Sequence, residues 1–367
     1  PVGRGGGGRA GVGGRAGLAA RGAGAGIPGR ERLLRGRLSA VGDIVHTLPV
    51  AAALAASRWE VIWAVQPGGR QLLAGNPAIA ACIVLPASSP FRPGAIVRAA
   101  AALRAAKADT ALDLQGLWKS GFWARASGAR RCIGWNAPAR REPLSAVLLT
   151  ERRELPAGVV HVIDKNLALL GSLGLDAVGR RDFPLPPLAR QAPDEPGQLA
   201  ALGLERPVIV HPGGGWSSKL WPAESYGELA SRLARRGIAT LVTWGPGEQA
   251  LAGRVVAASG GTAVAGFEAT LLDLAALARR ARAIVAADTG PLHLACAVGT
   301  PAVALFGPTD PARNGPWNPA DVVLQRRPPC FPCHHRECAR HRGILAQIPV
   351  AEVEQALLAR IGLADAG

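Results

Sequence analysis

The sequence predicts an α/β fold with two parallel sheets, one in each of two domains. Short apolar runs of the kind that form buried strands alternate with longer segments of helical periodicity, and this series occurs twice along the chain. Alternating strands and helices are typical of parallel sheets with crossover helices. A proline-rich segment at residues 186–198 separates the two series and is typical of an interdomain linker. At 367 residues the chain is long enough for two domains with separate cores.

The first domain is expected at residues 33–185. Before it, residues 1–32 are expected to be a disordered segment, because residues 1–30 hold 13 glycines and five arginines without a periodic apolar face. This segment also lacks the apolar core of about 7–15 residues that a signal peptide needs. The expected strands of the first domain are 33–38, 61–65, 83–85 and 111–114, and its expected helices are 44–56, 95–106, a helix ending near 125, and 159–173.

The second domain is expected at residues 199–348, followed by a C-terminal helical segment at 349–367. Its amphipathic helix is predicted at 350–361. The expected strands of the second domain are 208–211, 239–244, 283–287 and 302–306, and its expected helices are 225–235, 248–258, 271–281 and 292–298.

Composition and charge narrow the class of protein. Hydrophobic residues make up 49% of the chain and charged residues 19%, as in a globular protein. No apolar run reaches the roughly 18 residues that span a bilayer. The formal net charge of +16 favours anionic partners, namely a phosphorylated lipid, a membrane surface or nucleic acid.

The stretch at residues 288–311, DTGPLHLACAVGTPAVALFGPTDP, is the most informative one. A polar turn of Asp288, Thr289 and Gly290 follows a buried strand and starts a short helix that contains His293. The carboxyl end of a strand in a parallel sheet is where such folds bind ligands, and a helix start offers free N–H groups to phosphate. The structural alternative is that Asp288 only caps the helix.

This stretch resembles the signature of the family 9 glycosyltransferases, the ADP-heptose lipopolysaccharide heptosyltransferases. The resemblance implies two Rossmann-like domains in the glycosyltransferase B architecture, with ligands in the cleft between them. It implies an inverting enzyme without cofactor or catalytic metal, which moves heptose from ADP-heptose to Kdo-lipid A. It also implies a cytoplasmic protein held peripherally at the inner face of the bacterial inner membrane, with no nucleic-acid partner.

A second motif at residues 37–49, RLSAVGDIVHTLP, resembles the amino-terminal motif of the same family. By that resemblance Asp43 is the general base that deprotonates the acceptor hydroxyl. A carboxylate at a strand end can face the cleft in a fixed position, as this chemistry requires. The structural alternative is that Asp43 caps a helix beginning at Ile44.

The glycine-rich segment at residues 211–222, HPGGGWSSKLWP, follows a strand and precedes a helix. Its glycines allow close approach of the backbone, and Ser217, Ser218 and Lys219 offer donors to phosphate. The spacing of a Walker A loop is absent. In the family the equivalent lysine binds the donor diphosphate, and an acid at the position of Glu248 holds the nucleotide ribose. A solvated glycine turn and a first-turn helix acid are the structural alternatives.

The acceptor side is expected on a basic face of the first domain. Residues 113–120 and 140–144, DLQGLWKS and RREPL, look like the heptosyltransferase I branch of the family. Arginine suits phosphate because its planar fork binds two oxygens. A solvated basic face is the structural alternative. The expected acceptor-binding residues are Gln115, Lys119, Arg130 and Arg141.

Three cysteines and a histidine near the C-terminus leave a metal question open. Cys330, Cys333, Cys338 and His341 have a spacing that can bind structural zinc, with free thiols or a disulfide as alternatives. A non-enzymatic, arginine-rich nucleic-acid binder with a zinc knuckle is therefore one rival function. The other rival is a sugar-nucleotide epimerase of the same two-domain architecture.

Overall fold

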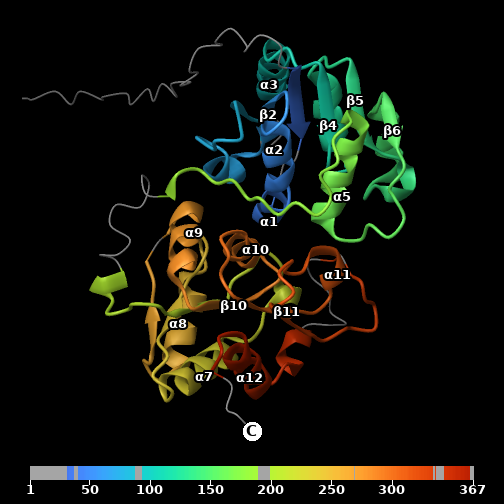
Figure 1. Ribbon diagram of the computed structural model, residues 1–367. Helices are drawn as coiled ribbons and strands as arrows, with labels where there is room; N and C mark the ends of the chain where they lie inside the picture. The colour runs from blue at the N-terminus through green and yellow to red at the C-terminus, as the bar shows by residue number, and fades with distance from the viewer. Residues whose placement is uncertain are drawn as a thin grey trace, which may run out of the picture.

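The computed structural model describes residues 31–36, 40–86, 93–188, 199–267, 269–333, 335 and 343–363. These residues form two α/β domains, each around a six-stranded sheet in which every neighbouring pair of strands is parallel. The first domain, blue to green in Figure 1, lies above the second, which is yellow to red. No helix in the described part of the chain is long and apolar enough to cross a bilayer.

The first sheet has the strand order β3-β2-β1-β4-β5-β6. Its strands are β1 (Glu31–Gly36), β2 (Trp59–Val65), β3 (Ala81–Val84), β4 (Thr110–Asp113), β5 (Arg131–Trp135) and β6 (Glu151–Arg153). Its α-helices are α1 (Val41–Val45), α2 (Leu48–Ala55), α3 (Pro93–Ala105), α4 (Trp118–Ala126) and α5 (Val162–Ala168). Its 3₁₀ helices are η1 (Pro67–Leu72), η2 (Ala137–Ala139), η3 (Pro143–Leu148) and η4 (Leu169–Leu173).

The second sheet repeats the same topology, with the order β12-β11-β10-β7-β8-β9. Its strands are β7 (Val208–His211), β8 (Thr240–Val242), β9 (Ala263–Ala265), β10 (Ala283–Ala287), β11 (Ala302–Phe306) and β12 (Val322–Gln325). Its α-helices are α7 (Ala223–Ala234), α8 (Gln249–Ala258), α9 (Leu271–Arg280), α10 (Gly290–Ala297), α11 (Pro311–Asn314) and α12 (Val350–Arg360). Its 3₁₀ helices include η6 (Ser217–Lys219) and η8 (Ile344–Gln347).

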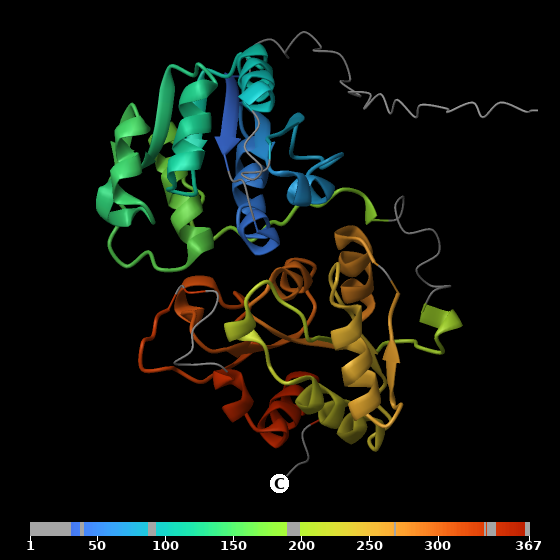
Figure 2. The same ribbon diagram turned by 180° about the vertical axis from the view of Figure 1, so that it is seen from behind.

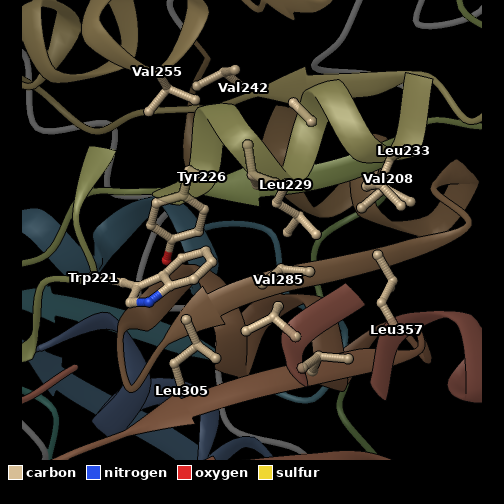
Figure 3. Packing of buried hydrophobic residues seen from close by; sticks show 14 of the residues in the cluster. Val208, Trp221, Tyr226, Leu229, Leu233, Val242, Val255, Val285, Leu305 and Leu357 are labelled. Atoms are coloured by element: carbon tan, nitrogen blue, oxygen red, sulfur yellow. The ribbon is translucent and has the colours of Figure 1, made fainter. Parts of the chain in front are cut away.

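Strands β10 and β11 of the second sheet are apolar throughout because helices cover both faces of that sheet. In β10, Val285 packs into a cluster with α7 and α12, while its neighbours Ile284 and Ala286 pack on the other face with α9 and α10. Figure 3 shows the first of these clusters, in which Trp221 and Tyr226 meet edge to face. The indole N–H of Trp221 donates to the carbonyl of Ile348 at 3.1 Å, which ties the start of α12 to the core. Helix α12 therefore belongs to the second domain.

The two domains meet through α1 and α10, which lie next to each other between the sheets in Figures 1 and 2. Two glycines allow this contact. A Cβ atom added at Gly42 would lie 2.6 Å from the His293 ring, and one added at Gly290 would lie 2.6 Å from Cβ of Val41. The ring centroids of His46 and His293 are 4.2 Å apart across the same contact.

The predicted order of the main strands and helices is confirmed, with local corrections. Strand β1 begins at Glu31, so the last two residues of the predicted segment 1–32 belong to the sheet; its other residues, and residues 189–198 of the predicted linker, lie outside the described residues. The predicted helix 44–56 begins at Val41 instead and is interrupted at His46 and Thr47. The hydroxyl of Thr47 donates to the carbonyl of Asp43 at 2.6 Å, which closes the first helix, and Pro49 lies in the first turn of the second.

Candidate functional site

The strand order predicts a ligand-binding position in each sheet. In each sheet the chain adds its first three strands toward one edge and its last three toward the other edge. The first and the fourth strand are therefore neighbours in the middle of the sheet. Ligands of open parallel sheets bind beyond the carboxyl ends of the strands at such a switch point. Asp43 and Gln115 follow the two strands at the first switch point, and Lys219 and Asp288 follow the two strands at the second. Residues predicted from separate motifs are thus gathered at two defined places.

Asp288 is the centre of a buried polar network at the second switch point. Its Oδ2 accepts hydrogen bonds from Nζ of Lys219 at 2.5 Å and from the hydroxyl of Thr309 at 2.7 Å. Its Oδ1 accepts one from the amide of Asn314 at 2.7 Å and lies 3.0 Å from Nε2 of His293. Asp288 therefore holds four side chains of the second domain around one carboxylate.

The charge of this network is balanced. Burial by itself raises the pKa of the Asp288 carboxyl, but the hydrogen bond with His293 and the charge of Lys219 lower it more, so this pKa lies well below its usual range. The Lys219 ammonium also lies 4.5 Å from the centre of the Trp216 ring. Asp288 is thus ionised at neutral pH. It does not act as the cap of α10, which was the structural alternative, because the N-cap residue is Thr289 and no side chain caps this helix.

Polar atoms next to Asp288 are left unpaired within the described part of the protein. Among the described residues, the hydroxyl of Thr289 and Nδ1 of His293 are buried without a hydrogen-bond partner. Gly290 begins α10, whose first N–H groups have no partner within the helix. The methyl group of Thr289 lies only 2.8 Å from a Cβ added at Gly214, so the glycine-rich loop after β7 packs directly against this turn.

Glu248 holds the glycine-rich loop in place. Its two carboxylate oxygens accept the N–H groups of Gly214 at 2.9 Å and Gly245 at 2.8 Å. A Cβ atom at Gly213 would overlap this carboxylate at 1.9 Å, which explains the glycine there. The sequence predicted Glu248 as a ligand-binding acid, but its contacts with the loop backbone were not foreseen.

A buried histidine beneath the loop gives a pH-dependent expectation. Burial lowers the pKa of His211 to about 4, although Glu248, with Oε2 at 3.9 Å from Nε2, offsets part of this effect. In the unfolded chain the histidine pKa is about 6.5, so below that pH only the unfolded state gains a proton and the free energy of unfolding falls. The loss should amount to about 2 kcal/mol between pH 7 and pH 5 and should end near the folded pKa.

The variant His211→Gln tests this expectation, because glutamine can still bond to the hydroxyl of Thr243, 3.0 Å from Nδ1 of His211, but does not titrate. Denaturant unfolding at both pH values should show a smaller drop for the variant than for the parent chain. An equal drop in both would assign the acid sensitivity to other groups.

Asp43 lies in the first turn of α1 and is half-buried. Helix α1 begins at Val41 and its N-cap is Ala40. The alternative that Asp43 caps a helix beginning at Ile44 is therefore wrong. The neighbouring Val41 and Gly42 touch α10 at Gly290 and His293. Asp43 is therefore placed where the first domain meets the Asp288 network of the second.

The predicted acceptor residues divide between two edges of the first sheet. Gln115 and Lys119 follow the carboxyl end of β4, and the backbone of Arg141 lies against Gly116 in the same region. Arg130 instead lies just before β5, at the opposite edge, where it pairs with exposed Asp109 at 3.2 Å. The structure thus brings Gln115, Lys119 and Arg141 together and leaves Arg130 away from them.

A buried ion pair supports the edge that carries Gln115, Lys119 and Arg141, and it was missed from the sequence. Arg140 donates to Asp113 at 2.6 Å with both side chains fully buried, and it also donates to the hydroxyl of Ser145. The other oxygen of Asp113 accepts the N–H groups of Gln115 and Gly116 at 3.1 Å. The pair sets the conformation of the loop that carries Gln115.

The remaining predicted residues are less informative. Ser217 is exposed, and Ser218 is buried and donates to the carbonyl of His335 at 3.3 Å. Cys333 is a buried free thiol and Cys330 is exposed, whereas Cys338 and His341 lie outside the described residues. No group of three metal-ligating side chains occurs among the residues that the structure describes.

Comparison with known proteins decides the family. A family model described as glycosyltransferase family 9 (heptosyltransferase) matches residues 96–342. The chain belongs to this family. Lipopolysaccharide heptosyltransferase 1 of Pseudomonas aeruginosa is 32% identical to this family 9 chain over 319 residues, which cover 84% of the chain and 87% of the relative. The protein of the same name from Escherichia coli K12 is 28% identical over 313 residues, covering 80% of the chain and 93% of the relative.

Solved structures agree on the fold. A family 9 glycosyltransferase from Veillonella parvula has a TM-score of 0.74 at 20% identity, over 90% of this chain and 97% of that one. The E. coli heptosyltransferase WaaC, solved with ADP, has a TM-score of 0.70 at 23% identity, over 90% and 99% of the two chains. The glycosyltransferase B architecture is thereby confirmed, and the family makes the chain a heptosyltransferase, which decides against the epimerase.

Proposed function

We propose that this enzyme moves a heptose from ADP-heptose to the Kdo-lipid A inner core of lipopolysaccharide, with inversion at the anomeric carbon. One observation carries the proposal: the Asp43 helix of the first switch point packs directly against the Asp288 turn of the second. A site built in this way can hold a base on one side and a leaving group on the other. The names of the relatives, which are lipopolysaccharide heptosyltransferases, support the substrate class.

The donor is proposed to bind at the second switch point. Its diphosphate would approach Lys219, the N–H groups at the start of α10 and the hydroxyls of Thr289 and Ser217, all of which can donate hydrogen bonds. Ser218 is left out of this set because its hydroxyl already donates to the carbonyl of His335. His293 would act with Asp288 to keep Lys219 in position. Glu248 fixes the loop and retains lone pairs on both oxygens for the hydroxyls of the ribose.

Asp43 is proposed to take the proton of the acceptor hydroxyl. The hydroxyl oxygen then forms a bond to the anomeric carbon while the bond from that carbon to the ADP oxygen breaks. The electron pair of the broken bond remains on the β-phosphate of ADP. Lys219 and the start of α10 would stabilise that negative charge as it develops, which is the usual way in which fixed donors lower such a barrier.

The anionic acceptor is proposed to lie against Gln115, Lys119 and Arg141. Guanidinium and ammonium groups bind the phosphates and carboxylates that such an acceptor carries. Arg130 has no place in this proposal because it lies at the opposite edge of the sheet. The enzyme is further proposed to work at the inner face of the inner membrane, and to bind no nucleic acid.

The proposal is tested by incubating the enzyme with ADP-heptose in the presence and absence of Kdo-lipid A. ADP should be released only when the acceptor is present, and the product mass should rise by one heptose. ADP release without acceptor, or an unchanged acceptor mass, would contradict the proposed transfer. A different nucleotide-heptose that reacts faster would correct the donor alone.

A further inference from the structure

Helix α4 and the 3₁₀ helix η3 carry a group of exposed apolar side chains on the first domain. Trp118 is 46% exposed and Phe122 is 45% exposed on α4, and Leu144 is 74% and Val147 is 64% exposed on η3. Of the exposed large apolar side chains in the described part of the chain, only Trp118 and Phe122 are aromatic. We call these four residues the α4–η3 surface.

The spacing within each helix brings its two apolar side chains onto one face of that helix. Residues four apart on an α-helix are neighbours, as Trp118 and Phe122 are, and residues three apart on a 3₁₀ helix are eclipsed, as Leu144 and Val147 are. The two helices pack together, because a Cβ atom added at Gly121 of α4 would lie 2.9 Å from the side chain of Leu148 on η3.

Polar contacts between α4, η3 and Arg140 hold the surface in this shape. The carboxylate of Glu142, directly before η3, accepts the N–H of Trp118 at 2.6 Å. The hydroxyl of Ser145 in η3 accepts from buried Arg140 at 2.9 Å and donates to the carbonyl of Glu142. The apolar side chains are thus presented outward by a fixed scaffold and are not the result of a loosely packed helix.

The charges around the α4–η3 surface are mainly positive. Lys119 and exposed Arg125 lie on α4 itself, and exposed Arg141 and Arg152 flank η3, with Arg152 donating to the carbonyl of Ala146. The nearby acids already have partners: the carboxylate of Glu142 accepts the N–H of Trp118, and Glu151 pairs with Arg131 and Arg153. Aromatic and aliphatic side chains with a basic border are typical of surfaces that bind at the interface of anionic membranes.

The position of the α4–η3 surface also favours binding to a membrane. Helix α4 follows β4 and η3 follows β5, so both lie at the carboxyl edge of the first sheet, next to Gln115 and Arg141. An acceptor anchored in a bilayer by its lipid part would reach this edge only if the edge faces the membrane. This step rests on the proposed acceptor, whereas the exposure and charge of the surface do not.

We propose that the α4–η3 surface inserts its apolar side chains into the boundary between headgroups and acyl chains of an anionic phospholipid bilayer. Insertion removes the exposed parts of Trp118, Phe122, Leu144 and Val147 from water, and the basic border binds the lipid phosphates. The acceptor-binding edge is thereby held at the depth of the lipid headgroups.

The test is flotation of the full chain with vesicles of phosphatidylethanolamine and phosphatidylglycerol that contain no acceptor. The parent chain should bind, and part of the binding should persist at high salt, because apolar insertion is not screened. The double variant Trp118→Ser/Phe122→Ser should bind at least about tenfold more weakly. The matched control Val97→Ser/Val178→Ser removes apolar side chains that are 68% and 51% exposed elsewhere on the first domain, and it should bind like the parent.

A second variant, Leu144→Ser/Val147→Ser, is needed in case the α4 variant does not fold. Leu144 and Val147 are more exposed than Trp118 and Phe122, so their replacement should disturb the fold less. Transfer to a water-soluble, deacylated acceptor separates this inference from the proposed function, since the surface variants should keep it. Equal vesicle binding by all variants, or complete loss of parent binding at high salt, would overturn the inference. So would a dimer of the parent that the variants dissociate, because the surface would then join two copies.

Discussion

Turnover of the Asp43→Asn variant should fall by a factor of about 10² to 10⁴, the usual effect of losing a general base. Asparagine keeps the size of the side chain but takes no proton from the acceptor hydroxyl. Asp43 is half-buried in the first turn of α1 and does not cap that helix, so the fold should survive the change. Initial rates with saturating ADP-heptose and acceptor give the measurement.

Two measurements distinguish this effect from damage to the domain contact. The melting temperature of Asp43→Asn should match that of the parent chain, and calorimetry should show nearly unchanged binding of ADP-heptose, because Lys219 and Asp288 lie in the other domain. A variant that melts early but keeps its turnover per folded molecule would place the base elsewhere and make Asp43 a structural residue.

The Lys219→Ala variant should lose both stability and donor affinity. Removal of the ammonium leaves Asp288 buried with less compensation, and breaking such a pair typically costs about 3–5 kcal/mol of folding free energy. The Lys219 side chain is 14% exposed and the Asp288 side chain 4%, so solvent screens the pair weakly. The lost contact with diphosphate should weaken ADP binding by about 1.5–3 kcal/mol, measured by calorimetry.

The double variant Lys219→Met/Asp288→Asn separates the two roles of the lysine. Neutralising both partners should restore much of the stability lost in Lys219→Ala, because no buried charge is left unpaired. It should not restore ADP affinity, which needs the positive charge. If ADP binds Lys219→Ala as tightly as the parent, the lysine serves only to balance Asp288.

The sequence was most informative for the strands that are buried on both faces. Strands such as β10 and β11 are continuous apolar runs because helices cover them on both sides, and their bounds were predicted to the residue. Strands β5, β6, β9 and β12 were not predicted. Strands β6, β9 and β12 are short and lie at a sheet edge, so their side chains carry little periodic signal. Strand β5 lies inside the first sheet, but its sequence RCIGW contains an arginine and a glycine and therefore is not a continuous apolar run.

The motifs located most of the candidate site, but not how its side chains pair. Lys219 and Asp288 were both expected to act on the donor, yet they lie 69 positions apart and nothing in their spacing indicates that they bind each other. The contacts of Thr309 and Asn314 with Asp288, and the buried pair of Arg140 and Asp113, were also missed. Such pairs depend on which loops meet after folding, which residue types alone do not specify.

The repeated strand order makes the two halves of this protein exchangeable in principle. Each domain has its own switch point. Under the proposed function, a chimera that combines the first domain of one relative with the second domain of another should change one substrate without the other. Two domains from different relatives would be compatible only if they preserve the contact between α1 and α10. A grafted first domain would need a residue as small as glycine at position 42, and its new partner would need one at position 290.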